Sequence, residues 1–132
     1  MPRLRTETFG AGDQSWLGST HGIANARTEV VNVSAFTAAT HFPNGYLPSG
    51  FPVAKVGGAL VPYVVDEATV TGAGVLAGHL LTDQPIATGA SNFAAPLLDH
   101  GRVKAAKVAS LALTGFVKPV AAAKNATTIV HI

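Results

Sequence analysis

The residues of this chain that are best suited to chemistry are its histidines, which we first consider as metal ligands. Imidazole is a common ligand of zinc and other transition metals, and metal motifs usually place two histidines close together in sequence. The chain has neither a His-Glu-x-x-His motif nor a His-x-His pair. Its histidines are scattered, at His21, His41, His79, His100 and His131. We therefore expect ordinary surface or core histidines, and a metal site would require the fold to bring distant residues together.

Asp99 and His100 are adjacent and could belong to a hydrolase triad. A triad also needs a nucleophile, and no Gly-x-Ser-x-Gly elbow is present. Neighbouring residues of a strand point to opposite faces, so these two side chains should diverge. The adjacent acidic pair Asp66 and Glu67 lies in a predicted turn, and we expect it to be solvated. The chain has no cysteine, which excludes thiol chemistry. We predict that the protein is not an enzyme and uses no cofactor.

Three further sequence patterns have simpler explanations than a functional site. Residues 72–77 fit Gly-x-Gly-x-x-Ala, but no helix or spaced acidic residue follows, so we expect a kinked strand. We expect no signal peptide, and we therefore expect the glycosylation patterns at Asn32 and Asn125 to be chance matches. Basic residues gather only at Arg102, Lys104 and Lys107, which we expect to be solvent-exposed. Too few cations cluster for direct nucleic-acid binding.

Composition points to a small protein that is covered by a partner. A length of 132 residues suits one domain, and a net charge of +2 gives no strong electrostatic field. Hydrophobic residues make up 48% of the chain but charged residues only 12%, about half the usual share. A surface so poor in charge is a solubility hazard on a free monomer, which favours permanent association. No apolar stretch is long enough to cross a membrane, so we expect no membrane association.

The elements that would position these residues begin after an N-terminal arm. Residues 1–28 are rich in glycine and mixed charge and show no helical or strand period, so we predict a flexible arm followed by a β-rich domain over 29–132. Tryptophan is unusual in such a segment, and Trp16 should be buried against a partner. Phe9, Trp16 and Leu17 are the predicted binding anchors. Trp16→Ala should then weaken binding without lowering the melting temperature.

Strands with glycine and proline turns dominate the rest of the chain. Alternation of Val31, Val33 and Ala35 predicts a half-buried strand over 28–36. Turns are predicted at 43–45 and 48–50, and a hairpin is predicted over 51–65 with its turn at Gly57 and Gly58. The following segments are predicted as a kinked strand with Gly72, Gly74 and Gly78, a loop over 82–96, a strand from 101 to 104, a short helix starting near Pro119, and a final strand over 127–132. Together these predict a mainly β single domain with at most one or two short helices.

The same segments resemble the head decoration proteins of tailed bacteriophages, in particular the lambda-like family found in actinobacterial phages. The resemblance rests on residues 13–19 (DQSWLGS) with His21-Gly22, residues 42–50 (FPNGYLPSG), the hairpin from Lys55 to Val65, residues 74–78 (GVLAG) and residues 126–129 (ATTI). It covers most of the chain.

That resemblance implies a compact fold of the β-clip or β-tulip kind and a function as capsid cement. The protein would bind the major capsid protein on the outer surface of the expanded head, as homotrimers at three-fold positions, and stabilise the head against packaged DNA. The leading arm would become ordered on the capsid. The alternatives are another virion surface module, such as a fibre, tail or glycan-binding β domain, or an enzyme on a β-clip fold, for which the expected acidic cluster is missing.

Overall fold

The computed structural model describes residues 14–19, 26–64, 71–87, 89–111, 116–120 and 122–132. Strands outnumber helices in these ranges, which confirms the predicted mainly β single domain with one short helix. The strands are β1 (Arg27–Val31), β2 (Tyr46–Leu47), β3 (Pro52–Val56), β4 (Ala59–Pro62), β5 (Leu76–Leu80), β6 (Gln84–Pro85), β7 (Phe93–Leu98), β8 (His100–Val103) and β9 (Thr128–His131). The helix is α1 (Ala105–Leu111), and short 3-10 turns span Val33–Ala35, Gly72–Gly74 and Ala122–Lys124.

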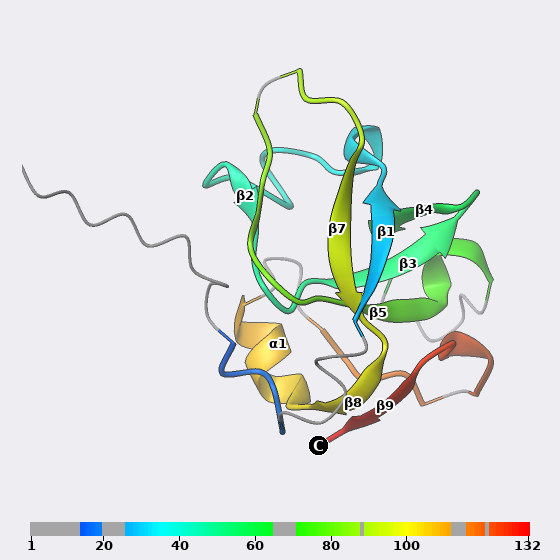
Figure 1. Cartoon of the computed structure of the whole chain (residues 1–132). Coiled ribbons are helices and arrows are strands. Elements are labelled where there is room, and N and C mark those ends of the chain that lie inside the picture. Colours follow the sequence, from blue (N-terminus) through cyan, green and yellow to red (C-terminus); the bar gives the residue numbers. More distant parts are fainter. Residues whose placement is uncertain (1–13, 20–25, 65–70, 88, 112–115, 121) are drawn as a thin grey trace, which may run out of the picture.

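Five strands close into a small barrel in the order β1-β4-β3-β5-β7 (Figure 1). Neighbouring strands are antiparallel except β1 and β4, which run parallel and meet at the single pair Val31 and Leu60. Buried side chains from all five strands fill the interior. We call this cluster the barrel core: Val31, Phe36, Leu47, Phe51, Val53, Leu60, Leu80, Ile86, Ala95 and Leu97.

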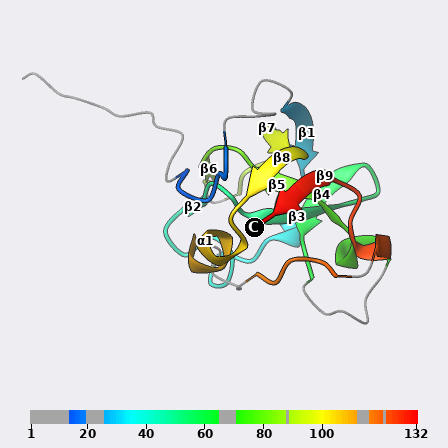
Figure 2. The same ribbon diagram turned by 90° about the horizontal axis from the view of Figure 1, so that it is seen from below.

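A second layer covers one end of the barrel. Strands β8 and β9 pair in parallel, and α1 follows β8 directly; Figure 2 views the molecule from this side. Side chains of this layer and of the barrel form a second cluster, the lower core: Trp16, Tyr63, Leu76, Leu98, Val103, Val108, Phe116 and Ile129. The chain therefore folds as one domain with two adjoining cores.

The predicted hairpin and turns are confirmed. Strands β3 and β4 pair antiparallel around Gly57 and Gly58, whose φ angles of 60° and 83° suit the turn that the right-handed twist of a hairpin requires. Gly45 and Gly50 also have positive φ, at the ends of the two predicted turns. Pro62 ends β4 beyond the pair with β1, where its missing N–H costs no ladder bond to that strand.

Gly78 confirms the predicted kink in a buried strand, whereas Gly72 and Gly74, which were predicted in the same strand, belong to the 3-10 turn that precedes β5. The register of β3 against β5 shifts between Val53 and Ala54, opposite Gly78, which has a φ of 153°. A Cβ atom at this position would lie 2.4 Å from the carbonyl oxygen of Leu98 on β7. Only glycine permits this close approach of two backbones.

Three elements differ from the sequence prediction. The first strand ends at Val31, and Val33–Ala35 form a 3-10 turn because Asn92 accepts a hydrogen bond from the Val33 N–H and so ends the extended run. Strand β7 occupies part of the predicted loop over 82–96. Its alanines and proline do not favour a strand, but β1 and β5 pair with it on both sides. The α-helix lies at Ala105–Leu111, where Val108 packs in the lower core, whereas the segment after Pro119 contains the short 3-10 turn at Ala122–Lys124.

Candidate functional site

The segment of residues 14–19 lies on the domain itself. It runs beside β8, where the Gly18 N–H donates to the Arg102 carbonyl (2.8 Å) and the Lys104 N–H donates to the Trp16 carbonyl (2.7 Å). Leu17 forms an antiparallel bridge with Val103. These bonds attach the segment to the free edge of β8 through a single β-bridge.

Trp16 is fully buried in the lower core. Its indole Nε1 donates to the Ser49 hydroxyl at 2.9 Å, and that hydroxyl donates to the Leu81 carbonyl at 2.9 Å. The ring lies over Gly50 so closely that a Cβ atom there would come within 2.9 Å of three indole atoms. The turn at 48–50 thus provides both the hydrogen-bond acceptor and the space for the tryptophan.

These contacts correct the prediction of binding anchors in a flexible arm. Trp16 finds its buried partner within the chain, because the edge of β8 and the turn at 48–50 offer it hydrogen bonds and apolar surface that a sequence pattern cannot reveal. Leu17 is half-buried and packs on the lower core. Phe9 lies outside the described residues. Neither Trp16 nor Leu17 is therefore free to anchor a partner in this structure.

Two histidines that are 52 residues apart in sequence meet beside this tryptophan. The Nε2 atoms of His79 on β5 and His131 on β9 lie 3.1 Å apart, and the Nδ1 atom of His79 lies 3.0 Å from the Gly50 carbonyl. His79 is fully buried, and its ring packs against Trp16 and Phe116. This pair could not be predicted from the sequence, because neither histidine belongs to a local motif.

The surroundings of this pair favour neutral imidazoles. Burial, opposed by the hydrogen bond to Gly50 and aided by a smaller contribution from the charge of His131, lowers the pKa of His79 from 6.5 to about 3. Burial lowers the pKa of His131 to about 4, with a smaller contribution from the charge of Lys118. Both rings are therefore uncharged at neutral pH.

Lys124 is a second buried polar group that sequence reasoning missed. It is fully buried, and its Nζ atom donates to the carbonyls of Gly74 (2.9 Å) and Val64 (3.3 Å). The same atom lies 5.0 Å from the centre of the Tyr63 ring, close enough for a cation–π interaction. The lysine ties the 3-10 turn at Ala122–Lys124 to the end of the barrel.

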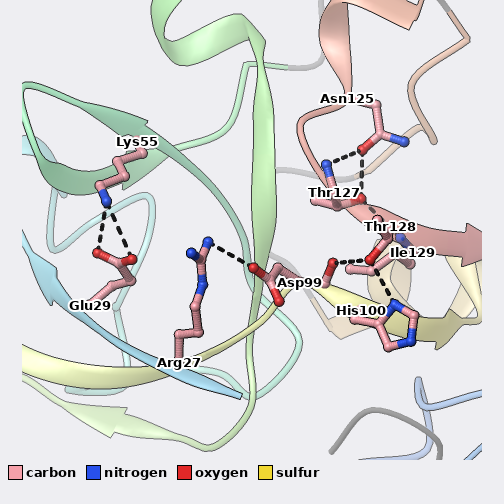
Figure 3. Close-up of polar contacts among 9 residues, drawn as sticks. All are labelled: Arg27, Glu29, Lys55, Asp99, His100, Asn125, Thr127, Thr128 and Ile129. Atoms are coloured by element: carbon pink, nitrogen blue, oxygen red, sulfur yellow. Dashed lines mark hydrogen bonds and ion pairs between the residues drawn. The ribbon is translucent and has the colours of Figure 1, made fainter. Parts of the chain in front are cut away.

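The polar groups on the surface are engaged in structural contacts (Figure 3). The Asp99 carboxylate pairs with Arg27 at 2.7 Å, whereas the His100 Nδ1 atom lies 2.7 Å from the Thr128 hydroxyl. As expected for neighbours near a strand end, the two side chains contact different elements, and they form no dyad. On the barrel, Lys55 pairs with Glu29 at 3.1 Å.

Other sequence candidates also have local structural partners. The Asn125 side chain accepts hydrogen bonds from the N–H (2.9 Å) and the hydroxyl (2.6 Å) of Thr127, which closes a turn before β9. Arg102, Lys104 and Lys107 are exposed, as predicted. Asp66 and Glu67 lie outside the described residues. In the ranges that the structure describes, no three His, Cys, Asp or Glu side chains come together as metal ligands.

Four exposed aliphatic side chains belong to the segments 116–120 and 128–132. Val117 and Val120 are 56% and 78% exposed, and Val130 and Ile132 on and after β9 are 56% and 58% exposed. The two segments that carry them adjoin, because the rings of Phe116 and His131 pack with centroids 5.5 Å apart. Val130 and Ile132 flank His131 in sequence and therefore point to the side of β9 opposite that ring contact. We call these four residues the C-terminal aliphatic patch. β8 and β9 face the viewer in Figure 2.

Two apolar hollows lie elsewhere on the barrel. One, of about 440 Å³, is lined mainly by Val33, Phe36, Phe42 and Ile86. The other, of about 530 Å³, is more open and lies between the exposed Val56 and Val64. Neither contains a charged side chain of the described residues. A hollow of this kind can accept an apolar side chain of a partner but offers little for orienting a polar substrate.

Comparison of the chain with known protein families, with curated proteins and with solved structures gave no match. In the part of the chain that the structure describes, no helix has the length and apolar character needed to cross a bilayer.

Proposed function

We propose that this chain is a head decoration protein of a tailed bacteriophage, which binds the outer surface of the expanded capsid and stabilises the head against packaged DNA. Its partner is the major capsid protein, and it assembles as homotrimers at three-fold positions. Support comes from the resemblance of its turn and strand segments to that family, together with its mainly β single domain.

The observation that carries the proposal is the C-terminal aliphatic patch on a chain with only 12% charged residues. Val120 is 78% exposed, and burial of such a side chain by a partner stabilises the complex by about 25 cal/mol per Å² of apolar area. A permanent partner also explains how a surface with so little charge stays soluble. We place the main capsid contact on this patch, with Phe9 as an additional contact.

The test is co-sedimentation of the purified protein with expanded, undecorated heads of the phage that encodes it. Full-length protein should saturate near three copies per three-fold site. The truncated variant for this test should lack only residues 1–13, because deletion of residues 1–28 would also remove Trp16 from the lower core and Arg27 from β1. Loss of binding in that truncated form would assign the contact to Phe9 and its neighbours.

Matched variants locate the contact on the folded domain. Val130→Lys adds a charge to the patch and should weaken head binding at least tenfold. Val30→Lys adds the same charge to an exposed valine of β1, outside the patch, and should leave binding unchanged. If the full-length protein does not sediment with heads at any concentration, the decoration function is wrong. A glycan array would then test the alternative of a fibre or tail module.

A further inference from the structure

The pair formed by His79 and His131 joins the two layers of the molecule. His79 belongs to β5 of the barrel and His131 to β9 of the second layer, and their Nε2 atoms are 3.1 Å apart. Trp16 of the N-terminal segment packs against the His79 ring at 5.8 Å, and Phe116 packs against both rings at 5.3 and 5.5 Å. Four segments that are distant in sequence therefore converge on one polar contact.

The hydrogen-bond partners determine where the protons lie in this pair. The Gly50 carbonyl can only accept, so the Nδ1 atom of His79 carries its proton and its Nε2 atom carries a lone pair. That lone pair accepts the Nε2–H of His131, whose own Nδ1 atom is then the remaining basic site. The contact therefore holds one proton between the two Nε2 atoms.

Added protons act against this arrangement. A proton on the Nδ1 atom of His131 leaves the contact in place but creates a cation beside apolar rings and near Lys118. A second proton, on the Nε2 atom of His79, would then set two N–H groups against each other at 3.1 Å, and the contact would break. In the open form, both rings would reach water and could accept protons without these costs.

The other described charges around the pair do not offset this effect. The segment 14–19 and strands β5 and β9 contribute no charged side chain besides the histidines themselves. Lys118 lies two residues after Phe116, and its positive charge disfavours a second cation at His131. Asp83 is held by the Ser49 N–H at 2.7 Å, and Arg102 and His100 of β8 are directed to other partners or to solvent.

We propose that the pair is an acid-sensitive joint, and that its protonation releases β9 and the Trp16 segment from the barrel while the barrel stays folded. Trp16 is coupled to the joint through the turn at 48–50, because Gly50 holds His79 and Ser49 holds the indole. Release exposes the tryptophan together with the lower core. This inference does not depend on the proposed capsid role.

Trp16 is the only tryptophan in the chain, so its fluorescence reports the opening directly. On acidification from pH 7.5 to 4, the emission should shift to the red before the β signal in far-UV circular dichroism is lost. Transfer of the buried His79 ring to water should by itself favour opening about 30-fold at pH 5, and the half-buried His131 should add a smaller factor. Coincident fluorescence and dichroism transitions would overturn the joint, because they would report global unfolding.

Matched variants test the histidines as the sensor. His131→Gln retains an N–H donor for His79 but cannot titrate in this range, so it should move the fluorescence midpoint to lower pH and reduce the steepness of the transition. His41→Gln removes a histidine that bonds to Thr37 and packs on the barrel, away from β9 and Trp16, and it should leave the midpoint unchanged. An identical midpoint in His131→Gln and the unmodified protein would refute the proposal.

Hydrogen exchange provides a second measurement that needs no variant. After correction for intrinsic rates, the amide of Ala126, which donates to the Leu76 carbonyl of β5 at 3.0 Å and so links the chain before β9 to the barrel, should lose protection at pH 5 relative to the amides of β7. Equal loss of protection at Ala126 and in β7 would contradict a local joint even if the variants did not fold.

Discussion

Replacement of Trp16 by alanine distinguishes a docked N-terminal segment from a free arm. The side chain is fully buried, and truncation of a buried aromatic residue costs about 3 to 5 kcal/mol. Loss of the indole N–H also removes a hydrogen bond from the buried Ser49 hydroxyl, which adds about 1 kcal/mol. The free energy of unfolding should thus fall by about 4 to 6 kcal/mol, a large share of the total for a domain of this size.

The assay is urea unfolding followed by far-UV circular dichroism, because the variant has no tryptophan to report fluorescence. With an m-value of about 1.5 kcal/mol/M, the midpoint should fall by about 3 to 4 M. Trp16→Phe is the matched control: it keeps most of the buried apolar area and loses the hydrogen bond, so it should cost about 1 to 2 kcal/mol. If Trp16→Ala unfolds within 1 kcal/mol of the unmodified protein, the segment does not dock on β8, and the arm predicted from the sequence would be restored.

Three further changes test other parts of the structure. Gly78→Ala should cost at least about 3 kcal/mol in urea unfolding, because the new Cβ atom would meet the Leu98 carbonyl at 2.4 Å; a loss below 1 kcal/mol would contradict the close approach of β5 and β7. Lys55→Ala should cost no more than about 0.5 kcal/mol, less in 1 M salt, since its ion pair is partly solvent-exposed, and a larger loss would show a role beyond that pair. Stability should be greatest above about pH 7 and fall on acidification, because the pKa of His79 is 6.5 when unfolded and about 3 when folded, so the unfolded chain binds the proton first. At pH 5 this histidine accounts for a loss of about 2 kcal/mol, the half-buried His131 for less, and urea midpoints that do not change between pH 7.5 and 5 would refute neutral buried imidazoles.

The features that could be predicted from the sequence are those encoded by a few neighbouring residues. Gly57 and Gly58 define a hairpin because few other residues adopt positive φ in succession, and both flanking runs are apolar. The β-branched run before Ile132 likewise predicts β9. Such local rules were sufficient for the fold class.

What could not be predicted depends on contacts between distant residues. Strand β7 contains Pro96 and two alanines, so its identity comes from β1 and β5, which pair with it. The burial of Trp16 requires the edge of β8 and the turn at 48–50, and the meeting of His79 with His131 requires both layers. No residue near any of these positions in the sequence indicates its partner.

The closure of the barrel has a consequence for the order in which the chain folds. Strand β1 pairs with β7, which lies about sixty residues later, whereas β3 and β4 are joined by a two-residue turn. Loop-closure entropy makes the distant pairing slow, so the hairpin should form early and β1 should join last. Because β1 also contacts β4 at Val31 and Leu60, its arrival closes the ring in one step. Substitutions on β1 should therefore mainly accelerate unfolding, whereas substitutions in the hairpin should slow folding.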